Sequence, residues 1–78
     1  MSFQNLSQEK VTIILPNTHS QDVEPTKTTG PLSMTGNYYI RKAGVNYYKF
    51  HFTRGSATLE SLADVPDGGE FQACFRLN

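Results

Sequence analysis

The stretch NYYIRKAGVNYYKFHFT, residues 37–53, decides the fold. Six of its seventeen residues are aromatic, and aromatic residues favour β-strands. Near its middle, Gly44 supplies the positive φ that a tight turn needs. The stretch therefore predicts a β-hairpin that turns at Ala43-Gly44 and lies at the centre of the fold.

The pairing within this hairpin depends on one residue of register. A two-residue turn places Ile40 opposite Tyr47 and Tyr39 opposite Tyr48. A bulge at Gly44 would shift these pairs by one position and exchange the tyrosines that face the core. The sequence leaves open which tyrosines are exposed.

Strands are also predicted on both sides of the hairpin. Residues 9–15 are rich in β-branched side chains and stop at Pro16, and residues 70–77 alternate apolar with polar side chains. The segment 56–64 is ambiguous, because Leu59, Leu62 and Ala63 have the spacing of one short helix while Asp64 could equally begin a turn. Residues 65–69 predict a turn in which glycines take left-handed conformations. The expected fold is all-β, a mostly antiparallel sheet forming a sandwich or small open barrel, with at most one short helix.

The predicted core combines the apolar positions of these segments. Its members are Val11, Ile13, Leu15, Ile40, Phe50, Phe52, Leu59, Leu62, Phe71, Phe75 and Leu77. With 78 residues, the chain is one small domain, residues 1–78, whose core is marginal for an isolated monomer.

Two segments lack a clear structural pattern. Residues 1–8 form a polar N-terminal arm whose expected anchors are Phe3 and Leu6, and residues 17–36 form a long loop rich in threonine and proline. A loop of this length is unusual in a compact domain and is often functional. Ordering both segments costs conformational entropy, so we expect neighbouring copies of the chain to hold them in place.

Charge is divided into three blocks although the chain is neutral overall. Residues 1–24 carry a net charge of −2, residues 25–59 carry +5 without any acidic residue, and residues 60–78 carry −3. Such segregation favours contact between copies, or pairing of opposite charges within one fold. The longest apolar run is too short to cross a membrane, and no signal peptide is visible, so a cytoplasmic or virion location is expected.

Catalytic residues are not predicted, and neither is a metal or cofactor site. His51 and Cys74 are the only candidates for a Cys–His dyad, and Cys74 is more simply explained as a small, inert side chain. His19 and His51 lack the spacing of metal ligands. Phosphate-binding loops and dinucleotide fingerprints are absent from the sequence. The expected function is therefore non-catalytic.

Two functional hypotheses remain open. The first is a structural protein that forms homo-oligomers or joins a larger assembly, including a virion component such as a phage capsid or tail subunit. The second is a single-stranded nucleic-acid-binding module that uses residues 37–54, where bases stack on tyrosines and cations meet phosphates. Both hypotheses assign contacts to the same residues, namely Tyr38, Tyr39, Arg41, Lys42, Tyr47, Tyr48, Lys49 and Arg54.

Overall fold

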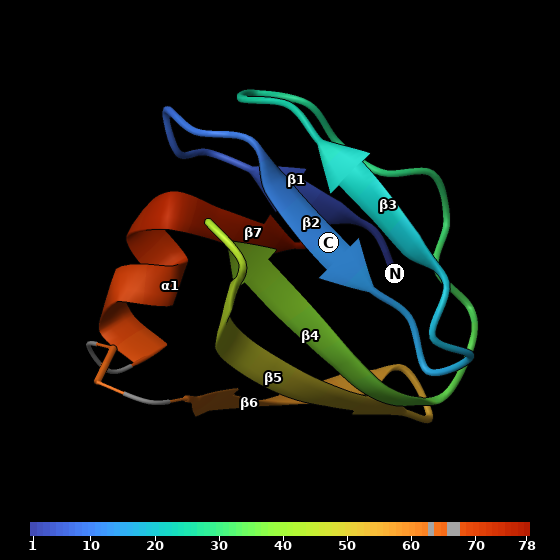
Figure 1. Cartoon of the computed structure of the whole chain (residues 1–78). Helices are drawn as coiled ribbons and strands as arrows, with labels where there is room; N and C mark the ends of the chain where they lie inside the picture. The colour runs from blue at the N-terminus through green and yellow to red at the C-terminus, as the bar shows by residue number, and fades with distance from the viewer. Residues whose placement is uncertain (63, 66–67) are drawn as a thin grey trace.

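Two antiparallel sheets and one short helix make up the computed structural model, which describes residues 1–62, 64–65 and 68–78 (Figure 1). The elements in chain order are β1 Phe3–Asn5, β2 Val11–Ile14, β3 Ser20–Val23, β4 Gly36–Lys42, β5 Val45–Thr53, β6 Ser56–Ser61, α1 Gly68–Cys74 and β7 Phe75–Leu77. Both sheets are open rather than closed into a barrel. The predicted fold class, mostly antiparallel sheet with at most one short helix, is confirmed for the described residues.

The predicted hairpin is formed by β4 and β5, inside a five-stranded sheet of order β3-β2-β4-β5-β6. Its turn is at Ala43-Gly44, where both residues have positive φ, 51° and 77°. A second turn of the same kind joins β5 to β6 at Arg54-Gly55, with φ of 50° and 76°. Two successive positive φ values define the type I′ turn, which matches the twist of the strands on either side.

A bulge in β5 corrects the predicted register. Lys42 pairs with Val45 and Arg41 with Asn46, but Ile40 pairs with Tyr48, so Tyr47 is the extra residue. The predicted pairs of Ile40 with Tyr47 and Tyr39 with Tyr48 are wrong by one residue, and the irregularity lies at Tyr47 rather than at the turn. Because of this shift, Tyr48 faces the core together with Ile40.

One face of the five-stranded sheet is covered by α1 and the small β1–β7 sheet, and the core lies between these layers (Figure 1). The buried apolar residues are Phe3, Val11, Ile13, Val23, Leu32, Tyr38, Ile40, Tyr48, Phe50, Phe52, Phe71 and Phe75. Of the predicted core, Leu15, Leu59, Leu62 and Leu77 are only partly buried. The rings of Phe3, Tyr48, Phe71 and Phe75 pack together, with centroids 5.2–6.5 Å apart.

The C-terminal region differs from the predicted strand over residues 70–77. Most of it forms α1, and only Phe75–Leu77 is a strand, which pairs with β1 instead of the hairpin. Phe71 and Phe75 are four residues apart, so a helical turn brings both rings to the core, 5.4 Å from each other. Conversely, the helical alternative for residues 56–64 is wrong, because residues 56–61 form β6.

The predicted turn at residues 65–69 falls partly outside the described residues. Pro66 and Asp67 belong to that undescribed part. Gly68 and Gly69 belong to the first turn of α1 instead of a left-handed turn.

The N-terminal arm and the long loop hold each other in place. Phe3–Asn5 forms β1, and backbone hydrogen bonds join it to residues 26–29 on one side and to β7 on the other. Within the loop, β3 pairs with β2, and Leu32 is buried. Both segments thus have partners within the same chain, and the expectation that neighbouring copies also hold them stays a prediction.

Candidate interaction surfaces

The eight predicted contact residues are divided between the two faces of the sheet. Tyr38 and Tyr48 are core residues, 0% and 1% exposed. Their rings pack on other aromatic side chains, and the Tyr38 hydroxyl donates a 2.6 Å hydrogen bond to the Met34 carbonyl. Burial raises the pKa of Tyr38. These two rings are therefore not available for stacking on a base or on another protein.

Lys42 and Tyr47 lie at the turn end of the hairpin, close to the acidic N-terminal block. The Lys42 Nζ is 3.1 Å from the Glu9 Oε2 and 5.6 Å from the centroid of the Tyr47 ring. The hydrogen bond that Lys42 donates to the Glu9 carboxylate is the main reason why the pKa of Lys42 is raised. This cation therefore already has an anionic partner and an aromatic partner within the chain.

The solvent-facing side of the five-stranded sheet presents Tyr39, Arg41 and Lys49. Tyr39 is half-buried between Ile14 on β2 and Lys49 on β5, its cross-strand neighbours. The Lys49 Nζ is 3.2 Å from the Glu60 Oε2. Further polar pairs on this face are Arg41 with Asn46, His51 with Asn37 and Thr12 with Asp22, at 2.8–3.0 Å. Opposite charges on neighbouring strands thus account for part of the block pattern in the sequence.

The candidate Cys–His dyad is not assembled. His51 lies on the solvent-facing side, where its Nδ1 is 2.9 Å from the Asn37 Oδ1. Cys74 ends α1 and packs against the core on the opposite side of the sheet. Over the described ranges, no group of three or more His, Cys, Asp or Glu side chains is placed to hold a metal ion.

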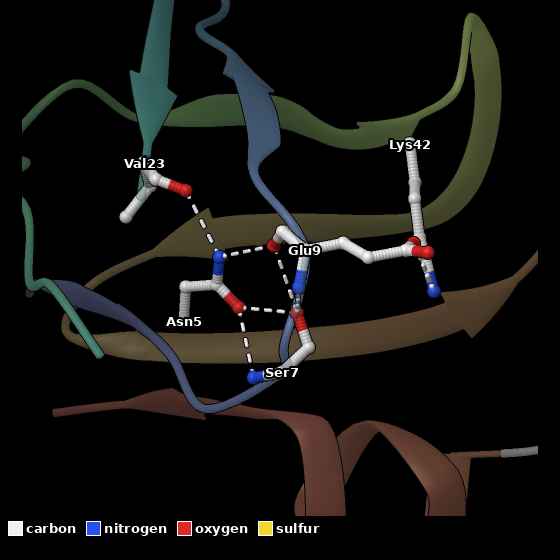
Figure 2. A network of polar contacts seen from close by, with 5 residues as sticks. All are labelled: Asn5, Ser7, Glu9, Val23 and Lys42. Atoms are coloured by element: carbon white, nitrogen blue, oxygen red, sulfur yellow. Dashed lines mark hydrogen bonds and ion pairs between the residues drawn. The ribbon is translucent and has the colours of Figure 1, made fainter. Parts of the chain in front are cut away.

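A buried polar network, which the sequence analysis did not identify, fixes the N-terminal arm (Figure 2). Asn5 is 0% exposed, and its Nδ2 donates to the carbonyls of Glu9 and Val23 at 2.8 and 2.9 Å. Its Oδ1 accepts from the backbone N–H and the hydroxyl of Ser7. All four contacts of the amide are short, so the network joins β1 to the beginning of β2 and the end of β3. Its geometry indicates a structural role.

The arm anchors behave differently from each other. Phe3 is 0% exposed and stacks on Phe75 with a centroid distance of 5.4 Å. Leu6 is 37% exposed, and so is Met34, while Val45 is 51% exposed. Near Val45, a hollow of about 230 Å³ is lined by Tyr47, Asp64 and Val65. Leu6, Met34 and Val45 come from three different segments, namely the N-terminal arm, the long loop and the start of β5.

The outer edge of β6 is the longest strand edge that ends a sheet in the described part of the chain. β6 has six residues, and its sequence SATLES contains neither proline nor lysine. Next to it is a hollow of about 390 Å³, whose lining includes Phe52 and Ala57 from the sheet and Met1 and Leu77 from the two chain ends. The sequence contained a signal for this strand, since Arg54-Gly55 separates two segments of strand-forming residues. The helical spacing of Leu59 and Leu62 competes with this signal and leaves the segment ambiguous.

Comparisons with known proteins add no assignment. The chain matches no family model, and neither the curated proteins nor the solved structures include a significant match. The helix found in the described residues, α1, has seven residues, and no helix there is long and apolar enough to cross a membrane.

Proposed function

We propose that this chain is a non-catalytic structural protein that associates with itself, as a homo-oligomer or as a subunit of a larger assembly. The observation that supports this proposal is the outer edge of β6, with which no strand in the described part of the chain pairs and which contains neither proline nor lysine. A strand edge presents unpaired N–H and C=O groups to any second strand, and monomeric proteins protect such edges with charges, prolines, bulges or short strands.

The other end of the five-stranded sheet has this protection. β3 has four residues, it follows Pro16 and precedes Pro25, and its Asp22 forms an ion pair with Lys10 at 3.6 Å. β6 is longer, and its single charge, Glu60, lies on the solvent-facing side next to Lys49. The contrast between the two ends supports a role for β6 in association.

A virion component, such as a phage capsid or tail subunit, is the finer form of this proposal. Its support is architectural: a small β-rich chain with one open sheet edge can form a closed dimer, and such a dimer suits use as the repeated unit of a larger assembly. The coarser proposal, self-association, does not depend on it.

The test of self-association is the mass of the purified chain in solution. Sedimentation equilibrium and light scattering over about 1 µM to 1 mM should give a mass that rises to a multiple of the 8.7 kDa chain. Circular dichroism at each concentration serves as the control that the fold is unchanged. A chain that remains monomeric over this whole range would contradict the proposal.

Single-stranded nucleic-acid binding is the second candidate, and the solvent-facing position of Tyr39 between Lys49 and Ile14 favours it. Binding of a labelled oligonucleotide should weaken steeply with salt and weaken further in Tyr39→Ala, because stacking on a ring contributes about 1–3 kcal/mol per base. Thr12→Ala on the same face is the matched control. No binding at low salt would eliminate this candidate.

A further inference from the structure

We infer that a second copy of this chain pairs with β6, antiparallel and about a two-fold axis through Thr58, so that two five-stranded sheets become one continuous sheet. This inference rests on the proposed self-association and specifies its surface and register. It goes beyond that proposal because it names which residues face each other across the interface.

The turn at Arg54-Gly55 determines which backbone groups of β6 point outward. In a two-residue hairpin, the residues flanking the turn, Thr53 and Ser56, form a hydrogen-bonded pair. Hydrogen-bonded and non-hydrogen-bonded pairs then alternate along the ladder, so Thr58 also points its N–H and C=O toward β5. The N–H and C=O groups of Ala57 and Leu59 point away from the sheet, where the strand order ends.

An antiparallel strand that is centred on Thr58 satisfies these outward groups in both copies. Ala57 of each copy then lies opposite Leu59 of the other, and each of these two pairs exchanges two hydrogen bonds. Because a two-fold axis places the same surface on both sides, the contact closes with two copies and leaves β3 at both ends of the joined sheet. The four hydrogen bonds across the interface come from Ala57 and Leu59 alone, so the backbone groups of Ser61, at the end of β6, take no part in them.

The side chains fit the same register on both faces of the sheet. On the core side, the large Leu59 of one copy lies beside the small Ala57 of the other, next to the 390 Å³ hollow that Ala57 and Phe52 line. On the solvent-facing side, Glu60 lies opposite Ser56 of the second copy and diagonal to its Arg54. Opposite charges are therefore neighbours across the interface, and no like charges are directly opposite.

The decisive experiment is disulfide trapping in a Cys74→Ser background. In the inferred register the two Thr58 residues form a non-hydrogen-bonded pair with Cα atoms about 4.5 Å apart, within the range that a disulfide spans. Thr58→Cys should therefore form a covalent dimer with oxidised glutathione. Ser56→Cys, the matched control on the same face, should not, because its Cα atoms are at least about 13 Å apart.

Two substitutions at one position test the edge independently of any cysteine. Ala57→Pro removes an outward N–H while leaving the β5–β6 ladder intact, and Ala57→Thr keeps that N–H. The dissociation constant of the dimer should rise about tenfold or more for the proline variant relative to the threonine variant. Circular dichroism checks that both variants stay folded.

The outcomes separate this inference from the proposal on which it rests. If the wild type associates but Thr58→Cys is not trapped, or Ser56→Cys is trapped equally well, the edge or its register is wrong and self-association stands. Equal dimer affinities for the two Ala57 variants would also overturn the inference. A wild-type chain that never associates would refute both, and an extended peptide of another protein would then be the occupant to test.

Discussion

Removal of the Asn5 side-chain amide should destabilise this protein strongly, because one small side chain holds several hydrogen bonds. In Asn5→Ala the carbonyl of Val23, a residue that is 3% exposed, loses its amide donor, and Ser7 loses the acceptor of its N–H. The Glu9 carbonyl gains a donor in this variant, because the Ser7 hydroxyl, 3.0 Å away, no longer donates to Asn5. At about 1 kcal/mol for each hydrogen bond, with a further penalty for buried groups left unpaired, the free energy of unfolding should fall by about 3–4 kcal/mol. A chain of this length has about 4–12 kcal/mol in total.

The assay is urea unfolding followed by far-ultraviolet circular dichroism, at a protein concentration where the chain is monomeric. Ser7→Ala is a graded comparison, because it removes the hydroxyl but keeps the backbone donor, and it should lower the unfolding free energy by about 1 kcal/mol. Gln8→Ala, at an exposed neighbouring position, should change it by less than about 0.5 kcal/mol. An Asn5→Ala variant within about 1 kcal/mol of the wild type would refute the reasoning.

The exchange Asn5→Asp tests the direction of the hydrogen bonds. It replaces a donor by an acceptor that faces two carbonyl oxygens, so the folded state favours the protonated acid and raises its pKa. When the pKa of an acid is higher in the folded than in the unfolded state, its contribution to stability is complete below the unfolded-state pKa. That contribution is lost as the pH rises through the folded-state pKa. The free energy of unfolding of Asn5→Asp, relative to that of Asn5→Ala, should therefore increase as the pH is lowered from 7 to 4.

Three further predictions use the same unfolding assay. Ala43→Asn should raise the unfolding free energy by about 0.5–1 kcal/mol, because asparagine accepts the φ of 51° more readily than alanine, and an unchanged or lower value would contradict the turn assignment. Burial raises the pKa of Tyr38, so the contribution of Tyr38 to stability is complete below about pH 10 and is lost as the pH rises above it. The free energy of unfolding should therefore decline less from pH 9 to 11 in Tyr38→Phe than in the wild type. The raised pKa of Lys42 affects both proteins equally. Phe3→Ala should cost about 3–5 kcal/mol, and a loss below about 1 kcal/mol would mean that β1 is dispensable.

The central hairpin was predictable because its signals are local. Aromatic residues flank Gly44, and a two-residue turn needs positive φ at both of its central positions. The bulge at Tyr47 was not predictable in the same way. Tyr47 and Tyr48 are identical neighbours, so the sequence does not distinguish the ring that enters the core, and packing against Phe71 makes that choice. The candidate contact residues inherited this uncertainty, since one residue of register decides which tyrosines are buried.

The C-terminal helix and the first strand were missed for two different reasons. FQACF places Phe71 and Phe75 at positions that satisfy both an alternating and a helical pattern, and Gly68-Gly69 is a poor helix start. Phe3–Asn5 has only three residues, and its partners are residues 26–29 and 75–77. Pairing over such sequence separations leaves no local pattern, so the arm resembled an unstructured segment.

These corrections change the basis on which self-association should be argued. The sequence suggested association because residues 1–8 and 17–36 needed an external partner, but they hydrogen-bond to each other and bury Phe3 and Leu32 within one chain. Deletion of residues 1–8 would remove the partner of β7 and uncover the Phe75 ring, so a lost oligomer in that variant would report unfolding. The argument now depends on β6, whose outward groups at Ala57 can be altered without removing a core side chain. Edge variants, rather than truncations, therefore distinguish an assembly subunit from a monomeric binding module.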